Sequence, residues 1–236
     1  MSNTYFQFKQ FIIHQEHCAM KVCTDSCVFG AWLASKANTN KRILDIGSGT
    51  GLLMLMLAQE SGASIDGIEI EPGCFRQLQS NLELSPWRDR LRALKADVRE
   101  YQFTEKYDLI VCNPPFYSSD LLSKSNTNQI ARHSIELSLA ELFNIVPGIL
   151  TPQGQFAVLL PYHRLEEAKK IGQHVGLKIY EQLDLYQTSG HEAFRVMICF
   201  SGEQHEAAKF SKLVIKNKAA YTADFVDLLK PFYLAF

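Results

Sequence analysis

The chain has 236 residues, of which 47% are hydrophobic and 21% charged, and its formal net charge is −1. This is the composition of a folded globular protein, and it excludes a protein that is basic over its whole surface. A nucleic-acid partner would therefore have to bind a local basic patch. No apolar run approaches the ~18 residues that a membrane helix needs, and the first residues lack a signal-peptide pattern, so we expect a cytoplasmic protein without membrane contact.

Short β-rich runs alternate with helical patterns from residue 41 onward. The expected strands are Arg42–Ile46, Ser64–Ile70, Leu91–Ala96, Leu109–Cys112, Gln155–Leu160, Leu177–Leu185 and Ala193–Phe200. The expected helices are Leu52–Ser61, Pro72–Leu84, Leu137–Leu150 and Leu165–Val175. Alternation of this kind indicates a mainly parallel sheet with helices on both faces.

The last two expected strands have no helix between them, so we expect them to pair in antiparallel fashion at one edge of the sheet. The predicted fold is a Rossmann-like α/β fold: seven strands, mostly parallel, with one antiparallel edge strand and helices on both faces. We expect one domain over 1–236, with an N-terminal segment over 1–40, a core over 41–201 and a C-terminal extension over 202–236.

Residues 43–55, ILDIGSGTGLLML, join an expected strand to an expected helix. Asp45 lies near the end of the strand, and Gly47, Gly49 and Gly51 follow at alternate positions. Such glycines permit a sharp turn and a close approach of the backbone to a ligand. The dinucleotide-binding pattern G-x-G-x-x-G is excluded because Leu52 occupies the position of its last glycine.

Further acids follow the next two expected strands. Glu69 ends the second strand, where a carboxylate can accept the hydroxyl groups of a ribose. Glu71 is the competing acid, but we favour Glu69 because Glu71 precedes Pro72 at the expected start of a helix. Asp97 follows the third strand. Together with Asp45, these acids beside a glycine loop indicate a binding site at the carboxyl edge of the sheet.

The pattern D-x-G-x-G-x-G over residues 45–51 resembles the first motif of the class I S-adenosylmethionine-dependent methyltransferases. The resemblance implies S-adenosylmethionine as the cofactor, whose sulfonium and ammonium groups an acid attracts. It assigns Asp97 and Val98 to the adenine ring and is consistent with Glu69 on the ribose. The glycine-loop residues expected to bind the cofactor are Asp45, Gly47, Ser48, Gly49 and Gly51.

Asn113, Pro114, Pro115 and Phe116 follow the fourth expected strand. Two prolines stop the strand and hold Asn113 in an extended conformation, so an ordinary strand-to-loop turn is one explanation. In methyltransferases the pattern [DNS]-P-P-[FYW] marks enzymes that modify a planar amino group. The resemblance therefore implies that the Asn113 oxygen and the Pro114 carbonyl accept the two N–H bonds of that group. Asn113 would also lie beside the cofactor, and Phe116 would stack on the target ring.

The N-terminal segment narrows this resemblance. Its matching residues are Met20-Lys21-Val22, Thr24-Asp25 and Gly30-Ala31-Trp32. With RHSIELSLAEL and YTADFVDLLKPFYL further on, it resembles the bacterial methyltransferases that form N6-methyladenosine beside the anticodon of valine tRNA. This resemblance spans nearly the whole chain and implies that Lys21, Thr24 and Asp25 lie near the methionine end of the cofactor. The usual glycine before Thr24 is Cys23 here, and the segment also fits a helix capped by Asp25 or Ser26.

For tRNA binding, the expected contacts are basic side chains in the C-terminal extension and around the polar loop over 117–131. The candidates are Arg132, Lys209, Lys212 and Lys216, with Lys218, Arg88, Arg90 and Arg92 as further possibilities. A solvated charged face is the alternative explanation for the lysine run. The aromatic residues near the C-terminus fit a helix packed on the sheet better than a base-stacking surface.

The expected activity is therefore methyl transfer to adenine N6 of a tRNA. The alternatives are a guanine-N2 methyltransferase of ribosomal RNA, a glutamine-N5 protein methyltransferase and a non-catalytic module that binds S-adenosylmethionine and RNA. The cysteines form no C-x-x-C pair, and no histidine cluster completes a zinc spacing. We therefore expect reduced thiols, no metal and a monomer.

Overall fold

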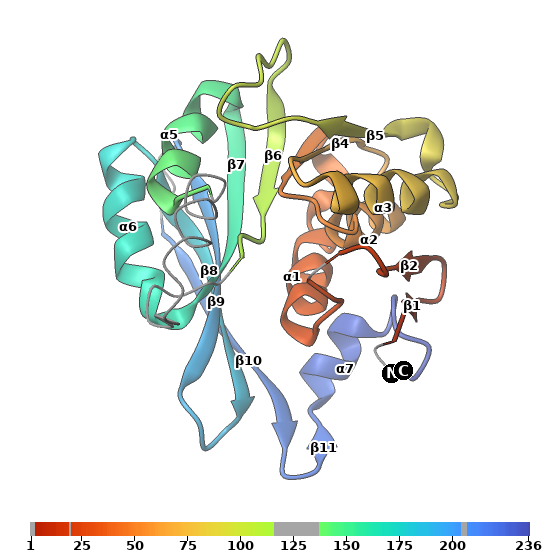
Figure 1. The fold of residues 1–236 in the computed structure, drawn as a ribbon. Coiled ribbons are helices and arrows are strands. Elements are labelled where there is room, and N and C mark those ends of the chain that lie inside the picture. The colour runs from red at the N-terminus through yellow and green to blue at the C-terminus, as the bar shows by residue number, and fades with distance from the viewer. Residues whose placement is uncertain (1–2, 19, 116–136, 204–206) are drawn as a thin grey trace, which may run out of the picture.

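The computed structural model describes residues 3–18, 20–115, 137–203 and 207–236. Over these segments, nine strands form one sheet (Figure 1). The strands are β3 (Arg42–Ile46), β4 (Ser64–Glu69), β5 (Leu91–Lys95), β6 (Tyr107–Cys112), β7 (Leu150–Pro161), β8 (Lys178–Thr188), β9 (Ala193–Ser201), β10 (Lys209–Asn217) and β11 (Ala220–Tyr221). Their order across the sheet is β11-β10-β8-β9-β7-β6-β3-β4-β5.

Helices cover both faces of this sheet (Figure 1). One face packs against α5 (Leu139–Ile149) and α6 (Leu165–His174). The opposite face packs against α1 (Thr24–Ala34), α2 (Leu52–Glu60), α3 (Pro72–Glu83) and α7 (Ala223–Leu229). Three short 3₁₀ turns among the described residues are η1 (Ala37–Thr39), η2 (Arg88–Arg90) and η3 (Tyr162–Arg164).

The central strands are largely apolar because both of their faces are buried. Along β6, Leu109 and Val111 lie in the core beneath α1 and α2, whereas Ile110 and Cys112 lie in the core beneath α5 and α6. This alternation is the two-residue period of a strand in a covered parallel sheet. Because alternate side chains of β6 are packed in both cores, the end of the strand is held in place, and the position of Asn113, the next residue, is fixed with it.

The predicted class, a mostly parallel sheet with helices on both faces, is confirmed. The strand number and the place of the reversed strand differ from the prediction. The antiparallel strand β9 lies inside the sheet between β7 and β8 and pairs with both. β9 is therefore not an edge strand. Beyond β8, β10 pairs with β8 in parallel, and β11 pairs with β10 in antiparallel fashion and forms the edge.

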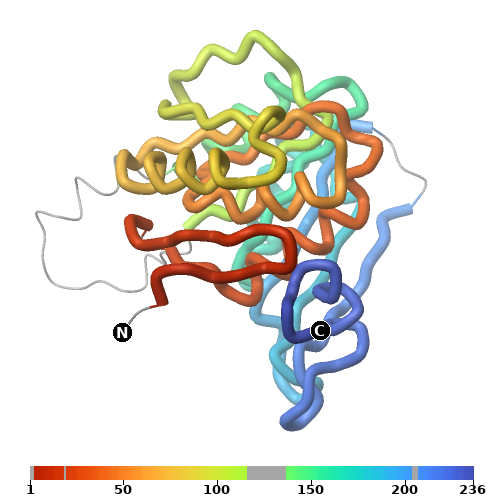
Figure 2. The backbone as a smooth tube through the Cα atoms, turned by 90° about the vertical axis from the view of Figure 1, so that its right-hand side faces the viewer, coloured from red at the N-terminus to blue at the C-terminus, as the bar shows by residue number. Residues whose placement is uncertain are grey.

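The chain ends come together outside the sheet. The strands β1 (Tyr5–Gln7) and β2 (Ile12–His14) form a separate hairpin, and Phe8 bridges to Tyr233. Figure 2 shows this N-terminal hairpin beside the C-terminal segment. The predicted C-terminal helix is α7, and it packs on β10 and α1 with Phe225 buried. The prediction of packed aromatic residues is confirmed for Phe225 and for Phe232, which follows the helix. It is wrong for Tyr221, which lies on β11 and is 48% exposed.

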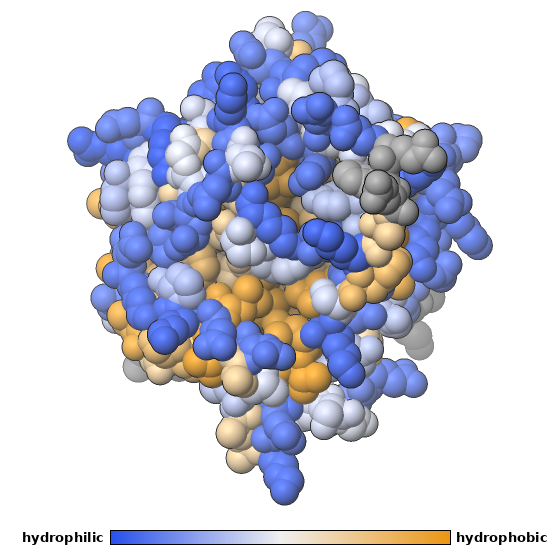
Figure 3. Space-filling model, turned by 180° about the vertical axis from the view of Figure 1, so that it is seen from behind, coloured by the Kyte–Doolittle hydropathy of each residue, from blue (hydrophilic) through white to orange (hydrophobic). Residues whose placement is uncertain are grey.

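None of the helices in the described segments is long and apolar enough to cross a bilayer. The six cysteines are all free thiols, and Cys18, Cys27, Cys112 and Cys199 are buried. Seen from behind, the surface is largely hydrophilic at its margins, and apolar side chains gather in a hollowed area in its lower half (Figure 3).

Candidate functional site

The glycine loop forms the floor of the site between β3 and α2. Gly47, Gly49 and Gly51 have φ values of 71°, 55° and 82°, which other residues adopt at a cost. The Gly47 N–H donates to the Ile68 carbonyl at 2.9 Å, which ties the loop to the end of β4. A Cβ at position 51 would lie 2.8 Å from Leu78 Cδ1, so α3 packs directly against the turn.

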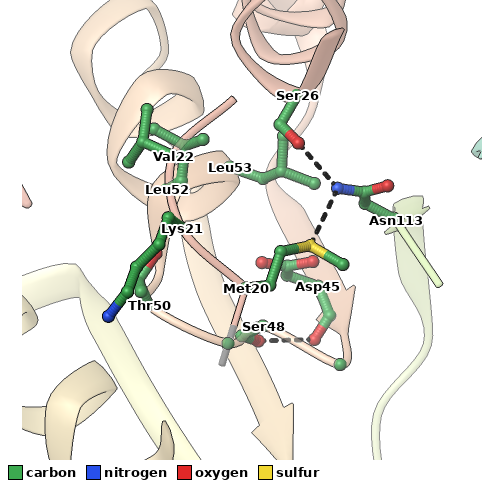
Figure 4. Close-up of a pocket in the computed structure, with 12 residues that line it drawn as sticks. Met20, Lys21, Val22, Ser26, Asp45, Ser48, Thr50, Leu52, Leu53 and Asn113 are labelled. Atoms are coloured by element: carbon green, nitrogen blue, oxygen red, sulfur yellow. Dashed lines mark hydrogen bonds between the residues drawn. The ribbon is translucent and has the colours of Figure 1, made fainter. Parts of the chain in front are cut away.

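Two adjoining cavities open at this carboxyl edge of the sheet. The larger one has a volume of about 310 Å³ and extends from the glycine loop past the ends of β4, β5 and β6. The smaller one lies beneath the N-terminal segment (Figure 4). Residues that line both cavities are Met20, Gly47, Gly49 and Asn113. The N-terminal segment, the glycine loop and the end of β6 thus meet at one site.

Asp45 lies in the smaller cavity with its side chain 1% exposed. Neither of its carboxylate oxygens has a hydrogen-bond partner among the described residues. Burial, and then the neighbouring Glu69 carboxylate, raises the pKa of Asp45 to about 8 against a smaller lowering by the Ser48 hydroxyl, which donates to the Asp45 main-chain carbonyl at 2.9 Å. An ionised acid that is buried without a partner is destabilising, so Asp45 binds a proton in the ligand-free protein unless a cation neutralises its charge. The Asp45 site therefore fits the positively charged end of S-adenosylmethionine.

Glu69 ends β4 and lines the larger cavity, with its side chain 8% exposed. It accepts the Gly49 N–H at 2.9 Å and the Glu71 N–H at 2.8 Å. Glu71 lines neither cavity and instead caps α3, accepting the Cys74 N–H at 2.6 Å. The geometry favours Glu69 over Glu71 as the acid that meets a ribose, since two backbone amides fix its carboxylate at the cavity wall.

Asp97 and Val98 lie farther along the larger cavity. The Arg99 guanidinium donates to both Asp97 oxygens, at 2.6 to 3.0 Å, and its hydrogen bonds lower the pKa of Asp97. Asp97 is therefore a fixed carboxylate, and the buried Val98 supplies an apolar wall beside it. A polar acceptor next to an apolar surface suits the edge and face of a purine ring.

Asn113 follows the last residue of β6 and lies at the junction of the two cavities. Its amide nitrogen donates to Ser26 Oγ at 2.8 Å, whereas its buried oxygen has no partner among the described residues. Figure 4 shows the nitrogen turned toward Ser26 and Met20 and the oxygen turned away from them. Pro114 and Pro115 continue the lining of the larger cavity. Phe116 lies outside the described residues.

The N-terminal segment matches the expectation only in part. Lys21 lines the smaller cavity, but its amino group donates to the Gln15 carbonyl and points away from Asp45 (Figure 4). Thr24 is exposed at the start of α1, and neither it nor Asp25 is among the described residues that line the two cavities. Asp25 instead accepts the Arg195 Nε–H at 2.8 Å and joins α1 to β9.

The expected cap of α1 by Asp25 or Ser26 is wrong. The helix begins at Thr24, and Cys23 occupies the N-cap position without a side-chain capping bond. Asp25 does not cap the helix because its carboxylate is buried in an ion pair with Arg195. Ser26, the next residue, lines the smaller cavity. The helix continues beyond Trp32 to Ala34.

The expected RNA-binding lysines lie on β10. Lys209 and Lys212 are exposed, and Lys216 is half-buried with its ammonium 4.9 Å from the centroid of the Tyr221 ring. Because Leu213 and Ile215 point into the core beneath α1 and α7, Lys212 and Lys216 share the opposite face of the strand. Lys209 therefore does not share a face with them. Arg132 lies outside the described residues.

Two of the three arginines near α3, Arg90 and Arg92, bond to other elements of the fold. Arg90 donates to the Ala63 carbonyl at 2.7 Å. Arg92 binds both oxygens of Asp66. Arg88 is exposed and lies 3.8 Å from an oxygen of Asp89.

Two residues at the site were not expected from the sequence. The sequence suggests Ser26 only as a helix cap, although it lies four residues after Val22. Gln15 holds this N-terminal segment in place, since its side-chain oxygen accepts the Val22 N–H at 2.8 Å. The signal in the sequence is a glutamine five residues before Met20, but its hydrogen-bond partner, the Val22 N–H, depends on the fold.

Comparison with solved structures supports the fold. A predicted O-methyltransferase from Agrobacterium tumefaciens superimposes with a TM-score of 0.66 at 18% identity, covering 87% of this chain and 95% of that one. The glycopeptide N-methyltransferase MtfA in complex with (S)-adenosyl-L-methionine gives a TM-score of 0.57 at 12% identity, covering 76% and 95%. At these identities, the likeness concerns the fold.

Sequence comparison is more specific. The family model of the methyltransferase small domain matches residues 19–159. A protein of Dyadobacter fermentans named tRNA1(Val) (adenine(37)-N6)-methyltransferase is 41% identical over 99% of both chains. Proteins with the same name from Cytophaga hutchinsonii and Actinobacillus succinogenes are 39% and 37% identical, over 99% and 98% of both chains. The chain therefore belongs to the methyltransferase small domain family and, within it, to the family of the tRNA1(Val) (adenine(37)-N6)-methyltransferases.

Proposed function

We propose that this protein transfers the methyl group of S-adenosylmethionine to the N6 amino group of adenosine 37 in tRNA1(Val). The observation that carries the proposal is the unpartnered, buried Asn113 oxygen beside the unpartnered Asp45 carboxylate. The first is an acceptor for an amino group, and the second is a site for a cation. The names of the full-length relatives supply the nucleotide and the RNA.

The residues proposed to hold the cofactor follow the two cavities. Asp45 neutralises its positive methionine end, Glu69 accepts from the ribose hydroxyls, and Asp97 with Val98 borders the adenine. Gly47, Ser48, Gly49 and Gly51 bring the backbone close to it, and Lys21, Thr24 and Asp25 are proposed to hold the segment above it. When bound, S-adenosylmethionine supplies an electrophilic methyl group on a sulfonium centre.

The residues after β6 are proposed to act on the target amine. An exocyclic amine conjugated to a ring is a weak nucleophile because its lone pair is delocalised. Acceptance of its two N–H bonds by the Asn113 oxygen and the Pro114 carbonyl orients the lone pair and stabilises positive charge on the nitrogen. Pro115 stiffens this stretch, and Phe116 is proposed to stack on the adenine.

The tRNA contacts are proposed for Arg132, Lys209, Lys212 and Lys216. Within this group, Lys212 and Lys216 share a face of β10. Their strand ends in the hairpin with β11, which projects beyond the carboxyl edge of the sheet (Figure 1). A cytoplasmic location, the monomeric state and independence from metal remain predictions.

The proposal is tested by incubating the purified protein with methyl-labelled S-adenosylmethionine and total tRNA, followed by nucleoside analysis. Label in N6-methyladenosine that the variant Asn113→Ala loses supports the proposal. Label in N2-methylguanosine of ribosomal RNA or in a protein glutamine would identify one of the two alternative enzymes. Cofactor binding without any transfer would indicate the non-catalytic module.

A further inference from the structure

Ser26 and Met20 surround the amide nitrogen of Asn113. The nitrogen lies 2.8 Å from Ser26 Oγ and 3.9 Å from Met20 Sδ. Both contacts come from the N-terminal side of the chain, whereas Asn113 follows β6, so the pair joins two walls of the site (Figure 4). The Asn113 oxygen is buried on the other side and has no partner among the described residues.

An asparagine amide can rotate to exchange its oxygen and nitrogen, and only one of the two orientations suits an amino-group substrate. With the oxygen toward the substrate, the amide accepts an N–H bond. With the nitrogen toward the substrate, two donors would face each other, and no hydrogen bond could form. The orientation of this amide therefore decides whether Asn113 can act.

The surroundings favour the productive orientation. The Met20 thioether has no proton, so it can accept from the amide nitrogen but cannot donate to the amide oxygen. Ser26 Oγ lies 2.9 Å from Cys23 Sγ, and this sulfur can accept a hydrogen bond from the hydroxyl, which leaves the lone pairs of Ser26 Oγ for the Asn113 amide nitrogen. A reversed amide would place its oxygen against the Met20 sulfur, which cannot donate, and could keep Ser26 as a partner only if the Ser26 hydroxyl turned away from Cys23.

We infer that Ser26, assisted by Met20, is a positioning residue that fixes the Asn113 side-chain amide with its oxygen toward the target amine. The inference rests on the proposed function of Asn113, and the position of the buried Ser26 at the wall of the smaller cavity supports it. Cys23 belongs to the same arrangement, since its sulfur lies within hydrogen-bond distance of the Ser26 hydroxyl.

A double-mutant cycle tests this role through turnover. Loss of one neutral hydrogen bond corresponds to about a threefold to tenfold change, so Ser26→Ala is expected to lower kcat by about this factor with little change in the Kd of S-adenosylmethionine. Ser26→Thr keeps the hydroxyl and is expected to restore kcat. In the Asn113→Asp background both carboxylate oxygens accept, so Ser26→Ala is expected to change kcat less than about twofold.

An equal loss of kcat in both backgrounds would overturn the inference, because it would show a general structural effect. A raised Kd of S-adenosylmethionine with unchanged kcat would also overturn it and would make Ser26 a cofactor contact. If Asn113→Asp has no turnover, the comparison of Ser26→Ala with Ser26→Thr decides: rescue by threonine supports the inference, and equal losses contradict it.

Nuclear magnetic resonance gives a readout that does not depend on activity. The Asn113 side-chain NH₂ signals are identified in ¹⁵N spectra by their loss in Asn113→Ala. In the unmodified protein we expect slow proton exchange at these signals, and in Ser26→Ala exchange at least about tenfold faster. Unchanged exchange would overturn the inference. Protection in a protein that methylates no tRNA would instead contradict only the proposed function.

Discussion

At the scale of single residues, the site combines groups that destabilise the folded protein when no ligand is bound. Asp45 is a buried acid without a partner, and the Asn113 oxygen is a buried acceptor without a donor. Each such group lowers the free energy of unfolding unless a ligand satisfies it. Both groups line the smaller cavity, so a ligand bound there could satisfy them. Without a ligand they only destabilise the strand ends, and this indicates a binding site at this part of the sheet edge.

Asp45→Asn tests this view through pH. The pKa of Asp45 is raised from 3.8 to about 8, so the folded state holds a proton that the unfolded state releases. This contribution to stability is complete below about pH 4 and is lost as the pH rises toward about 8. Asp45→Asn is therefore expected to raise the melting temperature of the ligand-free protein more at pH 8 than at pH 5.

The same substitution should weaken cofactor binding at least about tenfold, since it removes the negative charge. Calorimetry at pH 7 in buffers of different ionisation enthalpy should show proton release on binding to the unmodified protein and none for Asp45→Asn. Unchanged affinity and unchanged proton release would show that Asp45 does not meet the positive end of the cofactor.

Gly51→Ala tests the turn below the site. Gly51 has a φ of 82°, and an added Cβ would lie 2.8 Å from Leu78 Cδ1. We expect a loss of about 1 to 3 kcal/mol in the free energy of unfolding, measured by denaturant titration. The matched control is Gly62→Ala, since a Cβ there meets no atom within 4 Å. Equal stability of the two variants would contradict this account of the turn.

At the scale of elements, most of the sheet was predictable because its strands are buried on both faces. Runs such as Leu109–Cys112 carry only apolar residues, so their pattern identifies the strand, and only its start was missed by two residues. The sequence of β10 has the pattern of a charged run and not of a strand, because lysines lie at positions that the structure leaves exposed. The alternation of Leu213 and Ile215 with outward residues was its signal.

The geometry of β10 sharpens the prediction for tRNA. We expect the double variant Lys212→Ala with Lys216→Ala to lower tRNA affinity about threefold to tenfold and to reduce the salt dependence of binding. Lys178→Ala is the control, because this exposed lysine lies at the start of β8, whereas Lys216 aligns with Thr188 at its end. Filter binding at several salt concentrations measures both quantities. A loss no larger than that of the control would exclude this face of β10 from the tRNA-binding surface.

At the scale of the whole molecule, the fold brings three distant segments to one edge of the sheet. The N-terminal segment supplies Ser26, the glycine loop follows β3, and Asn113 follows the neighbouring strand β6. The glycines, acids and prolines were recognisable in the sequence because each has a local conformational or charge requirement. The contact between Ser26 and Asn113 was not, because it depends on how α1 packs across the sheet.

The order of the strands in the sheet could not be predicted from local sequence patterns alone. The alternation of strands and helices predicted a parallel sheet, but the place of β9 between β7 and β8 depends on pairing across the whole sheet. The same holds for the N-terminal hairpin beside the C-terminus, where Lys9 donates to the Lys230 carbonyl at 2.6 Å. Such contacts join residues far apart in the chain and leave no local pattern.

The proposal of methyl transfer to N6 of adenosine 37 is tested by measuring methyl incorporation into an unmodified tRNA1(Val) transcript. The comparison is the same transcript with guanosine in place of adenosine 37. We expect the protein to form N6-methyladenosine in the first transcript and to incorporate no methyl group into the second. We expect the Asn113→Ala variant to incorporate no methyl group into either transcript. Equal incorporation into both transcripts, or incorporation that survives Asn113→Ala, would contradict the proposed nucleotide and the proposed role of Asn113.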